Sequence, residues 1–498
     1  MRKFLLLPLL AVTAFADITL APLFSDHVVL QRDKPVPIWG NAEAGEHVEV
    51  TFAQETVGST ADANGRWVVV LSPLQASGLG AELVVRGKNE VRLQDVLVGD
   101  VWLCSGQSNM EFPVRRADNA AQEIAGANNA LIRHFKVARA KSDTPIETMQ
   151  GVWEVCSPTT VGEFTAVGYF FARDIQPRIA VPVGLINCTW GGTQIECWMS
   201  SAALSSEPRF AAVADNWKRM QTEWLPQKAA YDAALAEWQA DEAAGKFKNN
   251  KAAKPRPAAP PANGPTMAPS SLFNAMINPA VPFSIRGILW YQGESNFYNP
   301  GEYGALFTAM IRSWRQHFGQ GELPFYWVQL PNFKNGDPFG LTWAVLREEQ
   351  AKALALPATG QAVAIDIGDA NDIHPKNKQE VARRLALIAR SQLYGAHVDA
   401  SGPQFLSALR EGNAMRVRFA HAGTGLTARD KPLQSLQIAG ADRRFYPAAA
   451  RIDRDTLIVS TPQVREPVAV RYAWFNAPDA NLYNGAGLPA APFRSDNW

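Results

Sequence analysis

The sequence predicts an α/β protein in which a central domain with a parallel sheet is flanked by two β-rich modules. Between residues 98 and 401, apolar strand-like runs alternate with helix-like stretches, a pattern typical of a parallel sheet with helices on both faces. Short β-rich runs separated by turn residues fill the segments on either side. The 498 residues are about three times the length of a typical domain, which agrees with several domains in one chain.

The first sixteen residues have the features of a secretory signal peptide. Arg2 and Lys3 give a positive start, residues 4–12 form an apolar run, and the segment ends in Ala-Phe-Ala at 14–16, with small residues at the cleavage-site positions. The apolar run is shorter than the roughly 20 residues that cross a bilayer. We therefore expect residues 1–16 to be removed, the mature chain to have no membrane span, and the protein to be secreted or periplasmic.

Residues 17–97 are predicted to form an N-terminal β-sandwich module. Its strand-like runs are 27–30, 36–39, 47–50 and 67–70, with turn clusters between them. Several short strands at this spacing are typical of a small sandwich.

Residues 98–401 are predicted to form the central domain. Its strand-like runs are 101–104, 183–189, 288–291, 325–330 and 362–367, and its helix-like stretches are 164–175 and 379–394. We expect an insertion at about 205–268. Residues 210–242 within it have the composition of one or two polar helices, and residues 243–268, rich in Ala and Pro, that of an exposed loop.

Residues 402–498 return to short β-rich runs and are predicted to form a C-terminal β-rich module. The runs are 414–419, 456–459 and 468–472. No internal repeat relates this module to the first one.

Composition argues against a polyanion as the main partner. The chain has 48 Lys and Arg against 47 Asp and Glu, a formal charge of +1, so we expect no nucleic-acid binding. The four cysteines, Cys104, Cys156, Cys188 and Cys197, are too few and too widely spaced for a disulfide scaffold, and we expect buried free thiols, with one or two disulfide bridges as the alternative. The sequence shows no metal-ligand cluster and no phosphate-binding glycine loop, so neither a metal nor an organic cofactor is expected.

Ser108 is the first candidate for a catalytic residue. It follows the strand-like run 101–104 within the sequence Ser-Gly-Gln-Ser-Asn-Met at 105–110. In an open α/β sheet, ligands bind beyond the carboxyl ends of the strands, where the Ser108 hydroxyl is placed to act as a nucleophile. The alternative interpretation of such a serine is a helix N-cap.

A nucleophilic serine needs a base, and His374 is the strongest candidate among the seven histidines. It follows the run 362–367, and Asp369 and Asp372 precede it closely. A neighbouring carboxylate can orient the imidazole and stabilise its protonated form. The alternative interpretation is a group of exposed loop residues.

Two further loops follow strand-like runs. Residues 187–196 contain a Gly-Gly pair whose N–H groups can approach a ligand closely, and residues 290–296 carry amide side chains. Together with the N–H of Ser108, these groups can form an oxyanion hole. An ordinary turn is the alternative interpretation of the glycine pair.

Taken together, the four loops resemble the SGNH hydrolase superfamily, and within it the sialate O-acetylesterase-like carbohydrate esterases. The matching segments are Gly-Gln-Ser-Asn-Met at 106–110, Trp-Gly-Gly-Thr at 190–193, Trp-Tyr-Gln-Gly-Glu-Ser-Asn at 290–296 and Asp-Ile-His-Pro at 372–375. Residues 20–40, 481–484 and 492–494 also resemble this family. The resemblance implies a three-layer α/β/α hydrolase domain that removes O-acetyl groups from sugars.

The resemblance also implies residue roles. Ser108 is the implied nucleophile and His374 the implied base. The N–H groups of Ser108 and Gly192 are the favoured oxyanion donors, and the side-chain donor is Gln292 or Asn296.

The catalytic acid departs from the pattern of the superfamily. Many SGNH enzymes carry the acid three residues before the histidine, but that position is Asn371 here. Asp372, two residues before the histidine, is our first choice, with Glu294 and Asp369 as alternatives.

We therefore expect a secreted carbohydrate O-acetylesterase that acts through a serine acetyl-enzyme and has an O-acetylated sugar or glycan as its partner. Trp190 and Tyr291 are candidates for substrate binding, because aromatic rings pack against the apolar faces of sugars. One alternative is an acetyl xylan or acetyl xyloglucan esterase. A second alternative, of another class, is a non-catalytic secreted carbohydrate-binding protein. No feature of the sequence predicts an oligomeric state.

Overall fold

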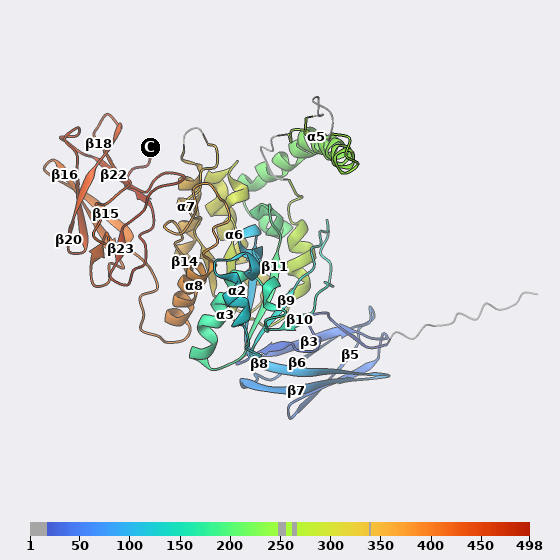
Figure 1. Ribbon diagram of the computed structural model, residues 1–498. Coiled ribbons are helices and arrows are strands. Elements are labelled where there is room, and N and C mark those ends of the chain that lie inside the picture. Colours follow the sequence, from blue (N-terminus) through green and yellow to red (C-terminus); the bar gives the residue numbers. More distant parts are fainter. Residues whose placement is uncertain (1–16, 248–254, 261–265, 338–339) are drawn as a thin grey trace, which may run out of the picture.

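The structure is a computed structural model and describes residues 17–247, 255–260, 266–337 and 340–498. The predicted signal peptide, residues 1–16, lies outside the described residues. A β-rich region, a central α/β region and a second β-rich region follow one another along the chain, and Figure 1 shows the β-rich regions on opposite sides of the central one. The predicted fold class is confirmed.

The N-terminal region is built from two sheets. Its strands are β1 Thr19–Leu20, β2 Val29–Gln31, β3 Val36–Asn41, β4 His47–Phe52, β5 Glu55–Thr60, β6 Arg66–Leu71 and β7 Ser77–Arg86. One sheet has the order β1-β3-β6, and the other joins β4 to β5 and β7. Buried and exposed residues alternate along β4 and β6, and the buried ones share one hydrophobic cluster, as in a sandwich.

Strand β8 (Glu90–Gly106) connects the N-terminal region to the central sheet. Its first part pairs with β7, and its second part pairs with β11 and β12. The boundary predicted between residues 97 and 98 therefore falls inside one continuous strand.

The central sheet has the strand order β10-β9-β11-β8-β12-β13-β14. Its other strands are β9 Ile132–Lys136, β10 Trp153–Val155, β11 Val183–Thr189, β12 Gly287–Tyr291, β13 Phe325–Val328 and β14 Thr359–Ala362. Neighbouring strands are parallel except for β9 and β10. The loops that follow β8, β11 and β12 therefore meet at one edge of the sheet.

The predicted strand 362–367 is wrong for most of its length. Strand β14 ends at Ala362. Val363 and Ile365 leave the sheet and pack into the hydrophobic cluster of the C-terminal region. These two side chains are apolar because they pack between the central and C-terminal regions, and not because they belong to a strand.

Helices cover both faces of the central sheet. The α-helices of the central region are α1 Ser108–Glu111, α2 Ala120–Ala125, α3 Ala166–Ile179, α4 Ser201–Leu204, α5 Ala211–Ala243, α6 Tyr303–Phe318, α7 Thr342–Lys352 and α8 Lys378–Gln392, and all of them except α5 lie close to the sheet. Short helical segments are η1 Val114–Arg116, η2 Val161–Glu163, η3 Ile195–Trp198, η4 Pro208–Phe210, η5 Phe273–Ile277, η6 Asn278–Ala280, η7 Glu294–Asn296, η8 Pro300–Glu302 and η9 Ala353–Ala355.

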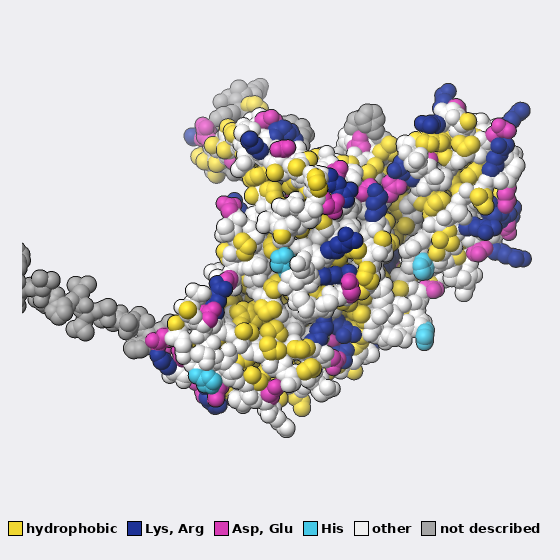
Figure 2. Space-filling view, turned by 180° about the vertical axis from the view of Figure 1, so that it is seen from behind, with side chains coloured by type: hydrophobic (Ala, Val, Ile, Leu, Met, Phe, Trp, Pro, Cys, Tyr) yellow, Lys and Arg dark blue, Asp and Glu magenta, His cyan; other side chains and the backbone are white. Residues whose placement is uncertain are grey.

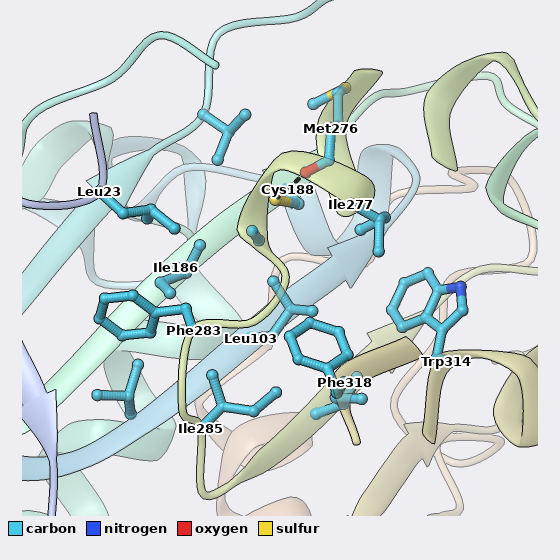
Figure 3. Close-up of a cluster of buried hydrophobic side chains, with 14 of the residues drawn as sticks. Leu23, Leu103, Ile186, Cys188, Met276, Ile277, Phe283, Ile285, Trp314 and Phe318 are labelled. Carbon is cyan, nitrogen blue, oxygen red and sulfur yellow. Dashed lines mark hydrogen bonds between the residues drawn. The ribbon is translucent and has the colours of Figure 1, made fainter. Parts of the chain in front are cut away.

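Alternate residues of the central strands enter different cores. In β8, Leu103 belongs to the cluster that contains α6, whereas Trp102 belongs to the cluster that contains α3 and α8. Figure 3 shows Leu103 beside Trp314 and Phe318 of α6. Because both faces are buried, the runs 101–104 and 288–291 are apolar at every position.

The four cysteines are buried and their thiols are free, which agrees with the prediction. In Figure 3 the Cys188 thiol donates a hydrogen bond to the Met276 carbonyl, with a sulfur-to-oxygen distance of 3.3 Å. Burial raises the pKa of this thiol, so Cys188 stays protonated and unreactive at neutral pH.

The insertion forms a single long helix, α5, which stands away from the central sheet in Figure 1. Val213 and Met220 are its only buried residues among those the structure describes. The helix is therefore held mainly at its start. Residues 248–254 and 261–265 of the loop predicted at 243–268 lie outside the described residues.

The C-terminal region is built entirely from short strands. They are β15 Gln404–Glu411, β16 Ala414–Ala420, β17 Leu426–Thr427, β18 Leu436–Ala439, β19 Phe445–Pro447, β20 Ala449–Asp453, β21 Thr456–Ser460, β22 Ala469–Tyr472, β23 Tyr483–Asn484 and β24 Phe493–Arg494. Two four-stranded sheets have the orders β15-β16-β21-β20 and β19-β18-β22-β24, and β17 pairs with β23.

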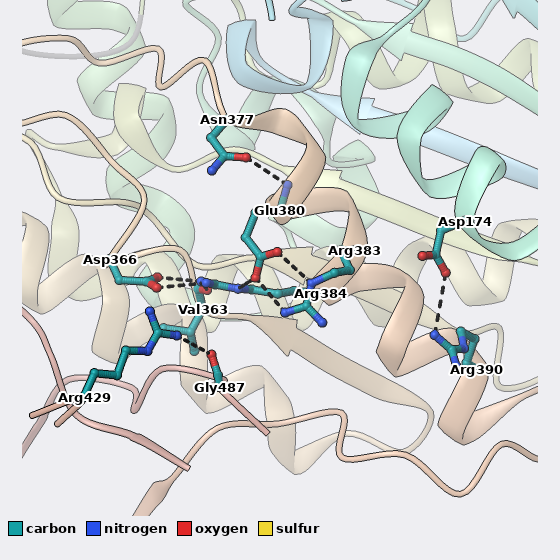
Figure 4. A network of polar contacts seen from close by, with 10 residues as sticks. All are labelled: Asp174, Val363, Asp366, Asn377, Glu380, Arg383, Arg384, Arg390, Arg429 and Gly487. Carbon is teal, nitrogen blue, oxygen red and sulfur yellow. Dashed lines mark hydrogen bonds and ion pairs between the residues drawn. The ribbon is translucent and has the colours of Figure 1, made fainter. Parts of the chain in front are cut away.

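A buried ion pair ties helix α8 to the chain that follows β14. Arg384 donates hydrogen bonds to both carboxylate oxygens of Asp366, at 2.6 and 2.9 Å, and its Nε donates to Glu380 (Figure 4). The side chains of Arg384 and Asp366 are only 4% and 6% exposed. This pair fixes the start of the loop that carries His374.

We expect Arg384→Met to destabilise the protein by about 3–5 kcal/mol, because it leaves the Asp366 carboxylate buried without its partner. Urea unfolding midpoints would measure the change. Arg383→Met is the matched control: Arg383 also binds Glu380, but its side chain is 41% exposed, so its loss should cost less than about 1 kcal/mol. Equal losses in the two variants would contradict the prediction.

The surface carries both signs of charge. Figure 2 shows Lys and Arg side chains interspersed with Asp and Glu over one face of the molecule. In the part of the chain that the structure describes, no helix has the length and apolar character needed to cross a membrane.

Candidate active site

Ser108 lies where strand β8 turns into helix α1. Gly106 makes the turn possible: its φ is +131°, and a Cβ there would lie 2.2 Å from the carbonyl oxygen of Tyr291. The next N–H, that of Gln107, donates to the same carbonyl at 3.0 Å. Ser108 is the first residue of the helix, after the N-cap position. The N-cap interpretation is therefore wrong, and the hydroxyl is free to face another group.

His374 is the group that Ser108 faces. Its Nε2 lies 2.8 Å from the Ser108 Oγ, within hydrogen-bond distance. The imidazole is partly buried and stacks near Phe112, with ring centres 6.4 Å apart. Burial lowers the pKa of His374, and the positive charges of Lys378 and Arg116 lower it further. The ring is therefore neutral at neutral pH, as a proton acceptor must be.

None of the three candidate acids hydrogen-bonds to the imidazole among the described residues. Asp372 comes nearest, with 3.9 Å between its Oδ1 and Nδ1 of His374. That oxygen instead accepts a hydrogen bond from the main-chain N–H of His374 at 2.9 Å. Asp369 accepts from the N–H of Asn371. Glu294 is buried, and its Oε1 accepts from the side chain of Asn109 at 2.6 Å.

The glycine loop lies directly against the nucleophile. A Cβ on Gly191 would stand 3.1 Å from the Cβ of Ser108. The Gly191 N–H donates to Glu111 at 2.9 Å, and Glu111 is itself paired with Arg139. The next residue, Gly192, has a φ of +75° and open space around its Cβ position. Its N–H and that of Ser108 have no acceptor within residues 17–247, 255–260, 266–337 and 340–498, as oxyanion donors would require.

The two candidate amides, Gln292 and Asn296, differ in how many of their hydrogen-bonding groups already have a partner. Gln292 uses all its groups: its Nε2 donates to Thr193 and Asn296, and its Oε1 accepts from Tyr303. Asn296 donates to the buried carboxylate of Glu196 at 2.8 Å. Because an amide nitrogen has two N–H groups, Asn296 keeps one without an acceptor among the described residues, and Gln292 keeps none.

The loop that carries Asn296 is attached to the nucleophile turn. The side-chain oxygen of Gln107 accepts hydrogen bonds from the N–H groups of Gly293 and Ser295, at 3.4 and 3.2 Å. Gln107 directly precedes Ser108. The loop at 290–296 and the turn that carries Ser108 therefore meet beside the Ser108 hydroxyl.

Of the two aromatic residues expected to contact substrate, only one is accessible. Trp190 is half-buried, and the guanidinium of Arg139 lies 5.5 Å from the centre of its ring. Tyr291 is fully buried beneath Lys378. As the last residue of β12, Tyr291 faces the core that contains α3 and α8, so we do not assign it to substrate.

Sequence reasoning did not single out two buried residues of this region, Lys378 and Asn109. Lys378 begins a helix rich in charged residues, where a lysine is normally exposed, yet it is fully buried here. Asn109 is also fully buried, and its only signal is its place next to Ser108.

Comparison with known proteins finds relatives over nearly the whole chain. A family model described as "Carbohydrate esterase, sialic acid-specific acetylesterase" matches residues 98–246 and 264–389. The chain is 30% identical to the sialate O-acetylesterase of Rattus norvegicus, over 95% of this chain and 94% of that protein. It is 28% identical to that of Homo sapiens, over 95% and 91% of the two chains.

A solved structure is similar over the whole length. The crystal structure of a carbohydrate acetylesterase from Xanthomonas citri is 41% identical, covers 97% of this chain and 100% of its own, and gives a TM-score of 0.82. The resemblance found in the four sequence segments is confirmed. The chain therefore belongs to the sialic acid-specific acetylesterase family of carbohydrate esterases and is a hydrolase that acts on acetyl esters.

Proposed function

We propose that this carbohydrate acetylesterase works through a serine acetyl-enzyme and that its sugar is O-acetylated sialic acid. The observation that carries the mechanism is the 2.8 Å distance between the Ser108 Oγ and Nε2 of a neutral His374. The sugar is proposed from the sialate O-acetylesterases to which the chain is similar.

In the first step, the Ser108 oxygen attacks the acetyl carbonyl while Nε2 of His374 takes the hydroxyl proton. The carbonyl oxygen becomes an oxyanion, which accepts hydrogen bonds from the N–H groups of Ser108 and Gly192 and from the Asn296 amide. When this intermediate collapses, the ester bond breaks, and His374 gives its proton to the departing sugar oxygen.

In the second step, water hydrolyses the acetyl-enzyme. His374 takes a proton from the water as it attacks the acetyl carbon, and then returns that proton to the Ser108 oxygen. The products are acetate and the free sugar hydroxyl.

Asp372 is retained as the acid of the site, but it acts through its charge. Its carboxylate raises the pKa of His374 against the larger effects of burial and Lys378, and so favours the imidazolium that forms during each step. Signal-peptide features at residues 1–16 support a secreted or periplasmic enzyme.

We expect Asp372→Asn to lower kcat only about 5-fold. The side chain is 48% exposed and its charge lies 3.9 Å from the ring, which is worth about 1 kcal/mol or less. A hydrogen-bonded triad acid would cost about 10⁴-fold when changed in this way. Steady-state hydrolysis of p-nitrophenyl acetate measures the ratio, and a loss near the larger figure would show that Asp372 turns to bond Nδ1 during catalysis.

Acetate release tests the proposed function. Wild-type enzyme is given O-acetylated sialic acid, acetylated xylan and acetylated xyloglucan at equal acetyl concentration. Fastest release from sialic acid supports the proposal. Faster release from a plant polysaccharide keeps the reaction and changes the sugar, whereas sugar binding without acetate release would favour a non-catalytic binding protein.

A further inference from the structure

A buried polar cluster lies behind the Ser108–His374 pair, and Asn109 is its centre. The Nδ2 of Asn109 donates hydrogen bonds to Oε1 of Glu294 at 2.6 Å and to the main-chain oxygen of Ile373 at 2.9 Å. Its Oδ1 accepts a hydrogen bond from Nζ of Lys378. The orientation of the amide is fixed from both sides, because the Ile373 oxygen can only accept and the lysine ammonium can only donate.

These contacts join the two halves of the catalytic pair. Asn109 directly follows Ser108, and Ile373 directly precedes His374. A shift of the loop at Ile373 relative to helix α1 would lengthen the distance from Nε2 to Oγ. The hydrogen bond from Asn109 to Ile373 is therefore a direct constraint on that distance.

The side chains around Asn109 are costly to bury. Lys378 is fully buried, and its ammonium lies 4.8 Å from the ring centre of Phe112 and 5.1 Å from that of Tyr291. Glu294 is 4% exposed, and its Oε2 has no hydrogen-bond partner in the part of the chain that the structure describes. Buried ionisable groups of this kind stabilise a fold less than apolar ones of the same size, which points to a role at the site.

We propose that Asn109, held between Lys378 and Glu294, is a positioning residue that sets the Ser108–His374 distance, and that Lys378, whose Nζ lies over the same Phe112 ring that stacks near His374, acts on the imidazole through its charge. The inference rests on the proposed serine mechanism. It explains how His374 is placed although no carboxylate among the described residues bonds to its Nδ1.

The charged groups that act on His374 come from three segments. Lys378 on α8 and Arg116 on η1 disfavour the imidazolium, and Asp372 on the same loop favours it. Burial lowers the pKa of Lys378 to about 7. The lysine is therefore charged below that pH, which is the range in which the histidine takes up its proton.

Two variants separate the two roles. Asn109→Asp keeps the size of the side chain but cannot donate to Ile373, so kcat should fall about 10-fold to 100-fold at nearly constant KM. Lys378→Met removes the charge, so the pKa of His374 rises and the acidic limb of kcat/KM should move up by about 1 pH unit. If Lys378→Met does not fold, Lys378→Gln takes its place, because glutamine keeps a hydrogen-bond donor for Asn109. The same shift of the acidic limb of kcat/KM is expected.

Lys376→Met is the matched control, because Lys376 lies two residues before Lys378, in the loop that carries His374, and is exposed. It should leave both kcat and the acidic limb as in wild type. If the acidic limb of kcat/KM stays at the wild-type pH in folded Lys378 variants, the proposed effect of the Lys378 charge is overturned. An equal shift of that limb in Lys376→Met overturns it as well. Full kcat in folded Asn109→Asp overturns the positioning role.

All variants are measured with p-nitrophenyl acetate beside Ser108→Ala. If Ser108→Ala keeps its turnover, the serine mechanism itself fails. If Ser108→Ala is inactive and the cluster variants behave as wild type, the inference fails alone.

Discussion

Ser108→Ala is expected to lower kcat for acetyl-ester hydrolysis by about 10⁴-fold or more without unfolding the protein. The Ser108 Oγ is the atom that would form the acetyl-enzyme, and it lies 2.8 Å from Nε2 of His374. Without it, only attack by water remains, helped by whatever oxyanion donors persist. Acetate release and p-nitrophenyl acetate hydrolysis, measured beside wild type, give the ratio.

Ser105→Ala is the matched control for this variant. Ser105 lies three residues earlier on β8 and is fully buried, and its hydroxyl has no hydrogen-bond partner among the described residues. Its removal leaves no partner unsatisfied, so activity should stay close to that of wild type. Turnover that survives in Ser108→Ala would exclude the acetyl-enzyme on this residue.

His374→Ala should be as inactive as Ser108→Ala, and the double variant should lose little more. Groups that act as one unit are not additive, because the second deletion removes a function that the first has already abolished. Losses that multiply would mean that the two side chains act in separate steps.

The sequence was sufficient for the fold class because the apolar pattern is strong. Strands buried on both faces read as continuous apolar runs, and the runs at 101–104, 183–189 and 288–291 all lie in strands. Residues 362–367 have the same pattern but lie mostly outside a strand. Apolar content reports burial, and it cannot tell burial in the sheet from burial against a neighbouring region.

The proximity of Ser108 and His374 could be predicted because both residues lie in short local motifs, whereas the contact of Asp372 could not. A carboxylate two residues before His374 has two possible partners, the imidazole and the main-chain N–H of His374. Aspartate commonly accepts from the N–H two residues later in the chain, and the structure has that bond at 2.9 Å. Only backbone geometry decides between the two.

The burial of Tyr291 and Lys378 also depends on the three-dimensional packing, which the sequence does not show. Trp290 and Tyr291 enter opposite cores because consecutive strand residues alternate, and the sequence does not show that helices cover both. Lys378 is buried because Phe112 and Tyr291 lie beneath it, and these residues are distant in the chain.

Asn296→Ala is expected to have the second large effect, a fall in kcat of about 10²-fold to 10³-fold with little change in KM, because an oxyanion donor acts mainly in the transition state. The N–H of Ile195 donates to Oδ1 of Asn296 at 3.0 Å, so Nδ2 must be the atom that faces Glu196. One N–H bonds to Glu196, and the other has no acceptor in the part of the chain that the structure describes. Single-turnover acetate release and the KM for p-nitrophenyl acetate measure the two quantities.

Tyr298→Phe separates catalysis from the loss of a buried contact. The Tyr298 hydroxyl donates to the other oxygen of Glu196, so this variant also leaves the buried carboxylate with one hydrogen bond fewer, but it removes no donor proposed for the oxyanion. A loss confined to Asn296→Ala assigns the oxyanion bond to that amide. Equal losses in both variants would trace the effect to Glu196 and leave the oxyanion to the N–H groups of Ser108 and Gly192, because Gln292 has no N–H to offer.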